Sequence, residues 1–563
     1  MSSTTPSQSA GVTTASYHSR RLTSNTLIMM VGLLGSRIAG FIRERVIAHQ
    51  FGQQYYTDIY NGSFTIPDLI FFLIAGGAIS SAFIPVFSEY IHTDREREAW
   101  RIFSVVLFVM TVFIGVLIVL GEIFAPTLVL LTNPGFAHIP HKVEDTVRLT
   151  RILLPAQLCF FLGGLMMGTL TARNIFSGQI LGPILYNVGI IFGGLFLTKR
   201  YGVAGLCWGA VGGAFFGNFV LQWIFVRATG GYLVTKNLLR YLRHPGVIQV
   251  FKLMLPVILG LALPQVSTII GKMFASDLGN GAQSALMNAN KLMHVPIALF
   301  GQAAGIAIFP VMAAQAARKE MAALRASVNF GLRAILFMSV PASILLYVLA
   351  LPIIQFLLQT GKYSYEDALI AAAVLRCFAI GTFAWCAISV AARGFYAMQD
   401  TKTPVIIGTL VTFVLVGLNL VFFKLFDRHD QTHAVANIAL TISITAILDM
   451  LALVYMLRIK LRGINGDRLM QSVLRTVLAS GVAGIVCWVL RNALQGFFVQ
   501  RQRYAFSINP GYRPHVTFEA FVIVTVCLTL STVVYLGMAL WLRMEEVNVL
   551  RRLFRRKGIA STN

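Results

Sequence analysis

Residues 26–51 of the chain read TLIMMVGLLGSRIAGFIRERVIAHQF, an apolar run long enough for one helix to cross the hydrocarbon core of a bilayer. Arg37 and Arg43 interrupt this run, and Glu44 follows directly. A charged side chain at the centre of a transmembrane helix costs roughly 2.5–3.5 kcal/mol on insertion scales. Arg37 and Arg43 at these positions therefore indicate that the helix faces a polar, hydrated cavity, and we expect the functional site there.

The rest of the chain has the composition of a membrane protein with many spans. Of its 563 residues, 56% are hydrophobic and 12% are charged, and the mean hydropathy is +0.73. Apolar windows recur along the whole chain without the ten-residue alternation of an outer-membrane barrel, so we expect an all-α protein with about fourteen transmembrane helices. The predicted spans are 26–51, 59–91, 101–126, 147–173, 177–198, 203–227, 247–275, 281–315, 325–350, 366–396, 402–424, 433–459, 468–491 and 518–543.

The formal net charge of +24 would suggest nucleic-acid binding in a soluble protein. Here, however, the cations lie mostly in alternate short connections between spans and in the C-terminal tail. Cytoplasmic loops of membrane proteins are enriched in Lys and Arg, so this distribution places both termini in the cytoplasm. We therefore expect no nucleic-acid partner.

An internal repeat divides the chain into two halves. The motif at residues 82–86, AFIPV, returns as AIFPV at residues 307–311, and Ala172-Arg173 returns as Ala392-Arg393. The paired spans lie six apart and run in the same direction, which predicts two six-helix lobes around a central cavity, related by an axis along the membrane normal. The predicted regions are a disordered cytoplasmic N-terminus (1–25), an N-lobe (26–227), a cytoplasmic linker (228–246), a C-lobe (247–459), two additional helices (460–543) and a basic cytoplasmic tail (544–563).

The sequence contains no recognisable enzyme motif. HExxH, GxSxG and a phosphate-binding glycine loop with its lysine are all missing. The six cysteines lie in apolar stretches without CxxC spacing, which favours a packing role over metal binding. We therefore predict a protein that is not an enzyme and that has no metal or cofactor.

Further cations are predicted at membrane depth where the second half begins. Lys272 lies near the end of span seven and Lys291 near the start of span eight. Together with Arg37 and Arg43 they outnumber the acids nearby, and a cavity with surplus positive charge suits a phosphate-bearing substrate. The alternative is that these side chains snorkel to an interface or pair with carboxylates and only hold helices together.

Two other charges lie deep inside predicted spans. Asp449 is within span twelve and has no obvious partner nearby in the sequence. It is either a site for a coupling cation or a hydrogen-bonded structural group, and the sequence leaves both open. Arg376 lies within span ten, and the sequence assigns it no role.

Several motifs together are similar to those of a known family. They are Ser36-Arg37-Ile38-Ala39-Gly40-Phe41-Ile42-Arg43-Glu44, Ala82-Phe83-Ile84-Pro85-Val86, Asn133-Pro134-Gly135-Phe136, Gly361-Lys362-Tyr363 and Gly394-Phe395-Tyr396. From about residue 25 to residue 460 the chain resembles the MurJ (MviN) lipid II flippase family, part of the multidrug/oligosaccharidyl-lipid/polysaccharide (MOP) exporter superfamily. The last two spans match in position and character only.

This resemblance implies a transport function in cell wall biosynthesis. Its members carry lipid II, the undecaprenyl-diphosphate-linked peptidoglycan precursor, from the inner to the outer leaflet of the bacterial inner membrane by alternating access. The resemblance implies that the membrane potential or a gradient of H⁺ or Na⁺ drives transport, and that the last two spans form a groove for the lipid tail. We expect a monomer with lipid II and membrane lipids as its partners.

The resemblance also implies which residues bind the substrate. Ser36, Arg37 and Arg43 match the family's group in span one, and Asp58 matches its acid between spans one and two. The full set of predicted substrate-binding residues is Arg37, Arg43, Lys291, Ser36, Asp58, Lys272 and Asn290.

Span eight departs from the family pattern. Where the family has an Asp-Arg pair followed by Glu, this chain has Asn290, Lys291 and His294. The departure leaves open a flippase for another polyprenyl-diphosphate saccharide or a multidrug exporter of the same superfamily. A membrane scaffold without transport activity is the alternative from another class.

Overall fold

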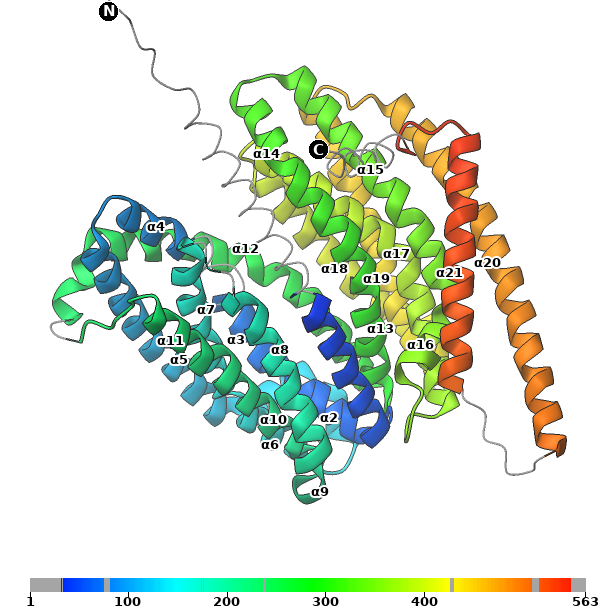
Figure 1. Ribbon diagram of the computed structural model, residues 1–563, viewed down its shortest axis with the longest axis horizontal. Coiled ribbons are helices and arrows are strands. Elements are labelled where there is room, and N and C mark those ends of the chain that lie inside the picture. Colours follow the sequence, from blue (N-terminus) through cyan, green and yellow to red (C-terminus); the bar gives the residue numbers. More distant parts are fainter. Residues whose placement is uncertain are drawn as a thin grey trace, which may run out of the picture. The chain divides into compact units, whose positions relative to one another are not determined.

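The structure is a computed structural model, and it describes the chain except residues 1–31, 33, 75–81, 174, 176, 236–237, 426–429, 509–515 and 548–563. Within the described part the regular secondary structure is helical (Figure 1). Eleven of these helices are long and apolar enough to cross a membrane. The prediction of an all-α membrane protein with many spans is confirmed, whereas the number fourteen stays a prediction.

The chain divides into two compact units. The first, which we call the N-unit, comprises residues 1–47, 63–129 and 144–262, and the second, the C-unit, comprises residues 48–62, 130–143 and 263–563. Two short segments from the first third of the chain, 48–62 and 130–143, therefore pack with the C-unit. Both carry residues of the site described below.

The N-unit is built from apolar helices around a core of large side chains. Its centre includes Phe83, Phe87, Trp100 and Phe103, all fully buried. Its helices are the first described helix (residues 34–51, in part), α3 (Thr65–Ile74), α4 (Ile84–His92), α5 (Glu96–Thr132), α6 (Lys142–Leu153), α7 (Ala156–Ala172), α8 (Ser177–Phe192), α9 (Thr198–Tyr201), α10 (Ala204–Ala214), α11 (Leu221–Ala228) and the first part of α12 (Pro245–Ser276).

Glycines let two helices of the N-unit approach closely. A Cβ atom added to Gly189 of α8 would lie 2.6 Å from the carbonyl oxygen of Gly209 in α10, and one added to Gly209 would lie 2.4 Å from the carbonyl oxygen of Gly189. Both distances are shorter than real Cβ contacts, so only glycine fits at either position. In lipid the hydrophobic effect does not drive helices together. Small residues favour helix packing there because they allow the backbones to approach closely.

The C-unit is centred on α17, which packs against α15 and α19. The helix begins with a capping box, in which the Ser364 side chain accepts from the Asp367 backbone N–H and the Asp367 carboxylate accepts from the Ser364 N–H. The helices of the C-unit are α2 (Tyr55–Ser63), α13 (Ala282–Pro296), α14 (Ala303–Ala317), α15 (Met321–Val348), α16 (Ala350–Leu358), α17 (Tyr365–Ala397), α18 (Lys402–Leu425), α19 (Gln431–Lys460), α20 (Gly466–Ile508) and α21 (Val516–Trp541).

Prolines in the C-unit free carbonyl groups that other helices then satisfy. A helical proline has no N–H for the carbonyl four residues earlier. Pro341 in α15 thus frees the carbonyl of Phe337, which accepts a hydrogen bond from the Tyr535 hydroxyl of α21 at 2.6 Å. A buried carbonyl without a partner costs free energy, so this bond fixes α21 against α15.

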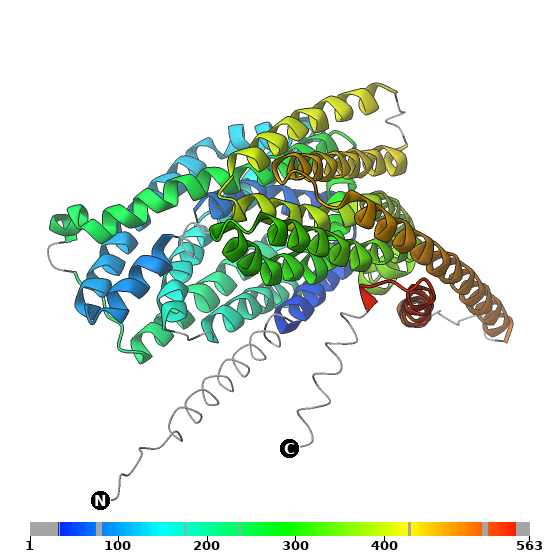
Figure 2. The same ribbon diagram turned by 90° about the horizontal axis from the view of Figure 1, so that it is seen from above.

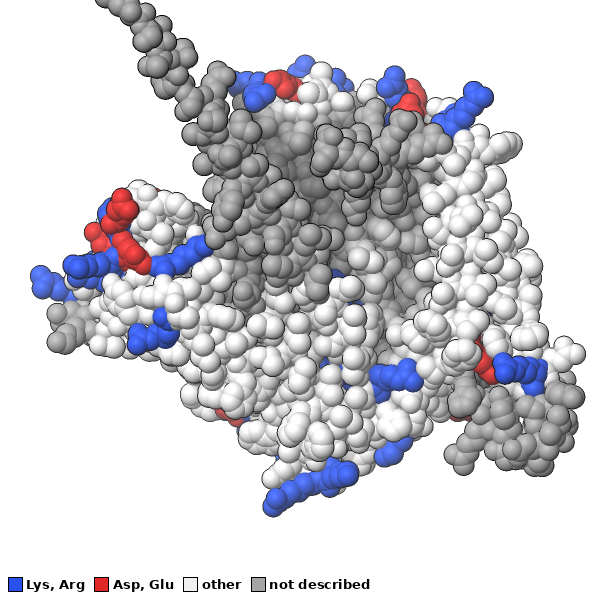
Figure 3. All heavy atoms as spheres, in the orientation of Figure 1, with Lys and Arg blue, Asp and Glu red and all other residues white. Residues whose placement is uncertain are grey.

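An ion-pair network fixes the same helices at the end where α21 finishes. Arg333 of α15 pairs with Glu546 at 2.6 Å and with Glu545 at 2.9 Å, both just after α21. Ser472 of α20 donates to the Glu546 carboxylate at 2.7 Å. The last two long helices are therefore attached to α15 by directional contacts. Between its two ends, the visible surface over α21 carries no charged side chain (Figure 3).

Helix α20 extends beyond its predicted end. The hydropathy window predicted a span ending at residue 491 and a long connection after it, whereas α20 continues to Ile508. The outer part of the helix projects past its neighbours in the C-unit (Figure 1, Figure 2). Hydropathy falls after residue 491, but the sequence there has no proline to end the helix.

Candidate functional site

The predicted arginine site in the first helix lies in the N-unit. Arg43 donates from Nη2 to the carboxylate of Glu44 at 2.5 Å and from Nη1 to the side-chain oxygen of Asn187 at 3.0 Å. Asn187 belongs to α8, and its Nδ2 donates to the carbonyl of Pro183 at 2.9 Å. The Arg43 and Glu44 side chains are 22% and 13% exposed, so the pair is partly hydrated.

Ser36 and Arg37 lie one to two turns before Arg43. The Ser36 carbonyl is 3.5 Å from Asn187 Nδ2, which brings Ser36 and Arg43 onto the same partner in α8. Arg37 is partly exposed, and no hydrogen bond or ion pair joins it to another described residue. A guanidinium with no such partner retains its five donors for water or an anion.

Asp58 is the centre of a polar cluster in the C-unit. The residue is fully buried, and its carboxylate accepts four hydrogen bonds. Lys142 Nζ and the Gly281 N–H donate to Oδ2 at 2.9 and 2.7 Å, and the Ser284 N–H and hydroxyl donate to Oδ1 at 2.9 and 2.7 Å. We call Asp58, Lys142, Asn280, Gly281 and Ser284 the Asp58 cluster.

Lys142 balances the charge of Asp58 inside the Asp58 cluster. Its side chain is also fully buried, donates to Asn280 Oδ1 at 2.9 Å and lies over the Phe136 ring at 4.4 Å from the centroid. The cluster leaves little acceptor capacity on the carboxylate, since all four of its usual acceptor positions are used. In this conformation Asp58 therefore holds protein groups in place.

The Asp58 cluster fixes the start of α13. Gly281 precedes the helix with φ +87°, a left-handed conformation that favours glycine, and the Ser284 N–H belongs to the first helical turn. A carboxylate that accepts from such N–H groups caps the helix and stabilises its positive end. Asn290 and Lys291, two of the predicted substrate residues, follow on the same helix.

Lys272 lies beside the Asp58 cluster, within the C-unit. It is 4% exposed, and its Nζ is 3.5 Å from the carbonyl of Asn61 in α2. Asn61 in turn donates from Nδ2 to the Ser284 hydroxyl at 3.2 Å. Lys272 is therefore enclosed by protein, whereas Asn290 and Lys291 are partly exposed.

Asp449 lies inside α19, as predicted for span twelve. The residue is partly buried, and its Oδ1 atom is buried and has no hydrogen-bond partner among the residues that the structure describes. A buried carboxylate oxygen without a donor is costly unless a proton or cation occupies it. A coupling role for Asp449 therefore stays a prediction, and the cost of this buried carboxylate oxygen is its physical reason.

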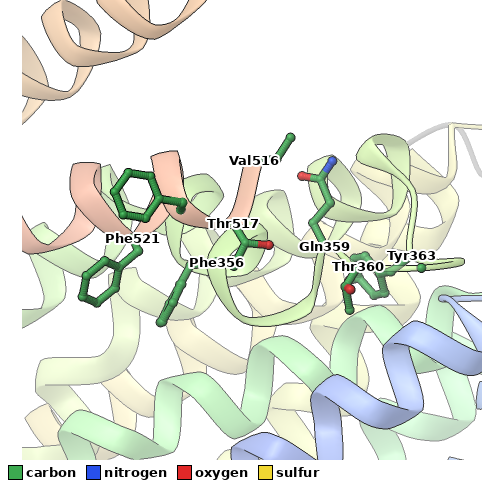
Figure 4. Close-up of a pocket in the computed structure, with 9 residues that line it drawn as sticks. Phe356, Gln359, Thr360, Tyr363, Val516, Thr517 and Phe521 are labelled. Carbon is green, nitrogen blue, oxygen red and sulfur yellow. The ribbon is translucent and has the colours of Figure 1, made fainter. Parts of the chain in front are cut away.

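An open hollow of about 600 Å³ lies elsewhere in the C-unit (Figure 4). Aromatic rings of Phe356, Tyr363 and Phe521 line it, together with the polar side chains of Gln359 and Thr360. It forms between the end of α16, the loop before α17 and the start of α21. None of the predicted substrate residues lines it.

The sequence identified the charged residues of these sites but missed their neutral and distant partners. Asn187, Ser284 and Lys142 were not singled out. The first two look like ordinary polar residues within apolar helices, and Lys142 looks like a cation in a loop before a span. Among the described residues, no group of three or more His, Cys, Asp or Glu is arranged to hold a metal ion.

The family model described as lipid II flippase MurJ matches residues 47–505. A relative from Buchnera aphidicola subsp. Acyrthosiphon pisum, described as a probable lipid II flippase MurJ, is 31% identical over 420 residues. The match covers 74% of this chain and 80% of the relative.

Solved structures agree at the level of the fold. A structure described as lipid II flippase MurJ in an inward closed conformation matches with a TM-score of 0.71 and 22% identity, covering 92% of this chain and 99% of that one. An inward-facing multidrug resistance MATE transporter of the MOP superfamily matches with a TM-score of 0.62 and 14% identity, covering 76% and 94%. The described helices thus have the fold of MOP transporters.

Proposed function

The chain belongs to the lipid II flippase MurJ family, and we propose from this membership that it moves lipid II from the inner to the outer leaflet for cell wall biosynthesis. The polyprenyl tail remains in lipid while the sugar-peptide head group crosses through the protein by alternating access. Transport requires only binding and conformational change, so the proposal includes no catalytic residue.

One observation supports this function most strongly, the available positive charge in the first helix. Arg37 has no hydrogen-bond or ion-pair partner among the described residues, and Arg43 keeps 22% of its side chain exposed although it pairs with Glu44. Guanidinium groups bind phosphates in a bidentate manner. We assign the contacts to the substrate diphosphate to Arg37 and Arg43. Lys291, a cation of the C-unit, stays a predicted substrate-binding residue.

The remaining predicted residues have different surroundings. Asp58 acts by holding the start of α13, and Lys272 lies beside it; Ser36 shares the partner Asn187 with Arg43. Asn290 precedes Lys291 on α13 and offers an uncharged amide for the head group. In the proposal Ser36 and Asn290 contact the substrate, whereas Asp58 and Lys272 contribute by holding the protein groups around them.

The energy source in this proposal is the membrane potential or a cation gradient. The buried Oδ1 atom of Asp449, which accepts no hydrogen bond from a described residue, supports a proton or Na⁺ as the coupling ion. Asp449→Asn would then abolish the response of transport to the gradient while leaving binding of lipid II intact. Transport that responds equally in both proteins would exclude Asp449.

We place the protein in the bacterial inner membrane as a monomer with both termini in the cytoplasm. The alternation of basic and less basic connections supports this orientation. Accessibility of cysteines introduced near residue 22 and near residue 558 to an impermeant reagent on either side of the membrane tests it.

The decisive experiment measures which leaflet contains labelled lipid II. Vesicles carrying the protein should expose lipid II in the opposite leaflet, and Arg43→Ala should slow this at least about tenfold, the effect of losing roughly 1.4 kcal/mol of phosphate binding. Arg200→Ala, which removes an exposed arginine in α9, is the matched control and should transport normally.

The same assay tests the alternatives. Asn290, Lys291 and His294 depart from the family pattern in span eight. They favour a second candidate function, the transport of a different polyprenyl-diphosphate saccharide, which would be flipped in preference to lipid II. A multidrug exporter would instead move amphipathic cations. A membrane scaffold would move none of these, and Arg43→Ala would lower its abundance.

A further inference from the structure

The hollow at the end of α16 contains none of the residues assigned to transport. Its wall comes from three places in the C-unit, which are the last turn of α16, the loop of residues 359–364 and the first turns of α21. Its volume of about 600 Å³ is typical of small-molecule sites, which span roughly 300–1,000 Å³. The side chains that line it therefore decide which ligand chemistry it can accept.

The loop of residues 359–364 has a fixed shape. The Tyr363 hydroxyl donates to Gln53 Oε1 at 2.7 Å, and the Lys362 N–H donates to the His49 carbonyl at 3.0 Å. Gly361 has φ +56°, and a Cβ atom there would lie 2.3 Å from the same carbonyl oxygen, so only glycine fits. These partners belong to the C-unit, so the loop is held from within its own unit. A wall that is formed in advance lowers the cost of binding a ligand.

One side of the hollow is aromatic. Phe356 of α16 and Phe521 of α21 pack with their ring centroids 5.3 Å apart and their planes inclined by 42°. Figure 4 shows these two side chains on one side of the hollow and Gln359, Thr360 and Tyr363 on the other. Phe521 is 45% exposed, so part of its ring is accessible to a ligand. The face of an aromatic ring carries negative charge density, which attracts C–H groups.

The other side of the hollow offers an unused hydrogen-bond acceptor. The Oε1 atom of Gln359 is buried and accepts no hydrogen bond from a described residue. A buried amide oxygen without a donor is unfavourable, and such groups usually indicate a bound water or ligand. A ligand that supplies a hydroxyl or an N–H group would satisfy this oxygen.

The charge of the lining excludes most ionic ligands. Among the described residues, those that line the hollow are all uncharged. Lys362 belongs to the same loop, but it is exposed and does not line the hollow. A phosphate would thus have no cation inside the hollow, and an organic cation would have no carboxylate there and would be repelled by the nearby ammonium group. The lining therefore favours an uncharged ligand.

A sugar ring has all the properties that the lining requires. It is uncharged, its faces present C–H groups to aromatic rings, and its edge carries hydroxyl donors. An acetamido substituent adds an N–H donor. An acyl chain, by contrast, could cover the aromatic rings but would leave the Gln359 oxygen without a donor.

We propose that this hollow binds a neutral saccharide. One face of the sugar lies against Phe521 and Phe356, and a hydroxyl or acetamido N–H donates to Gln359 Oε1. The residues assigned to the diphosphate and to the coupling ion take no part in this site. The inference therefore goes beyond the proposed function and does not depend on it.

Binding of a soluble disaccharide to the whole protein tests this site. The protein is placed in phosphatidylcholine nanodiscs, which contain no sugar, and N,N′-diacetylchitobiose is titrated with saturation-transfer NMR as the readout. Gln359→Leu removes the acceptor with little change in size, and Phe521→Leu removes one aromatic ring. The matched controls are Gln355→Leu, one turn earlier in α16, and Phe413→Leu, at an exposed phenylalanine of α18; neither residue lines the hollow.

We expect saturable binding to the native protein and to both controls, and at least fivefold weaker binding to Gln359→Leu and to Phe521→Leu. The unfolding midpoint of each variant separates the loss of the site from the loss of the fold. Equal binding to all five proteins, or no saturable binding to the native protein, would overturn the proposal. Equally tight binding of an uncharged dipeptide amide would also overturn it, in favour of a peptide ligand.

Flipping of lipid II is measured separately on the same preparations. Slower flipping by Gln359→Leu, together with weaker binding of the disaccharide, would identify the head group of the transported lipid as the source of the sugar. Unchanged flipping would identify another glycan. A native protein that binds the disaccharide but flips no lipid II would disprove the proposed function and support this site.

Discussion

The Asp58 cluster of the C-unit and the arginines of the first helix in the N-unit contain the same kinds of side chain in opposite settings. Asp58 and Lys142 are fully buried, and four hydrogen bonds reach the carboxylate. Arg43 and Glu44 remain 22% and 13% exposed, and Arg37 has no described partner. A buried charge whose hydrogen-bonding positions are all used stabilises the structure, whereas a partly exposed charge with unused positions can bind a ligand.

The largest effect should follow from removing the cation of the Asp58 cluster. Lys142→Met leaves the Asp58 carboxylate buried without its ion-pair partner, which typically costs about 3–5 kcal/mol of stability. The loss should appear as a large drop in the midpoint of thermal unfolding in detergent.

The double variant Asp58→Asn with Lys142→Met is the control for this prediction. Removing both charges eliminates the uncompensated carboxylate, so the double variant should be more stable than Lys142→Met alone. Lys199→Met, an exposed lysine in α9, should have no effect. If Lys142→Met has the same unfolding midpoint as the native protein, the Asp58 cluster does not stabilise the structure.

The first helix should give the opposite pattern, with a loss of transport and almost no loss of stability. Arg37→Gln removes a charge that has no described partner, so the unfolding midpoint should stay within a degree or two of the native value. Flipping of lipid II should fall at least about tenfold, equivalent to roughly 1.4 kcal/mol.

Arg37→Lys sharpens this prediction, because it keeps the charge and loses the bidentate geometry. Its transport rate should lie between those of the native protein and Arg37→Gln. A variant Arg37→Gln that flips normally, or one that unfolds early, would remove the distinction between the two regions.

The sequence predicted the type of fold and the charged half of the site because both depend on local patterns. Span length and the arginines of the first helix can be read in one window of residues 26–51. The partner of Asp58 could not be read in this way, since Lys142 lies 84 residues away in the chain, in the separate segment 130–143. Asn187, a neutral residue, carries no charge signal at all.

The proline contact illustrates the same limit more finely. Pro341 marks in advance that the carbonyl of Phe337 loses its helical donor. The sequence does not say which side chain replaces it, because that depends on how α20 and α21 pack against α15. Packing between distant helices is set by the whole structure.

The proline contact between α15 and α21 should have an intermediate effect on stability. Tyr535→Phe removes the hydroxyl that donates to the Phe337 carbonyl and leaves that buried oxygen without a donor, at a cost of about 1–3 kcal/mol. The unfolding midpoint should fall by less than in Lys142→Met.

A second substitution can restore the missing donor. Pro341→Ala returns a backbone N–H to the position four residues after Phe337, so the helix can satisfy that carbonyl itself. In the Pro341→Ala background, Tyr535→Phe should therefore cost clearly less than in the native protein. Equal costs in both backgrounds would show that the hydroxyl acts through packing and not through the freed carbonyl.

The smallest effect should come from the neutral partner of Arg43. Asn187→Ala removes the hydrogen bond to Arg43 Nη1, but water can replace it because the Arg43 side chain is 22% exposed. We expect a stability loss of about 0.5–1 kcal/mol and a transport rate that falls about two- to fivefold, since Arg43 keeps its charge and loses only part of its positioning.

Asn218→Ala, at another buried amide of the N-unit, controls for the loss of a side chain near α8. A stability loss in Asn187→Ala as large as that of Lys142→Met would mean that the arginine site is as dry as the Asp58 cluster, and the contrast between a structural and an available charge would then fail.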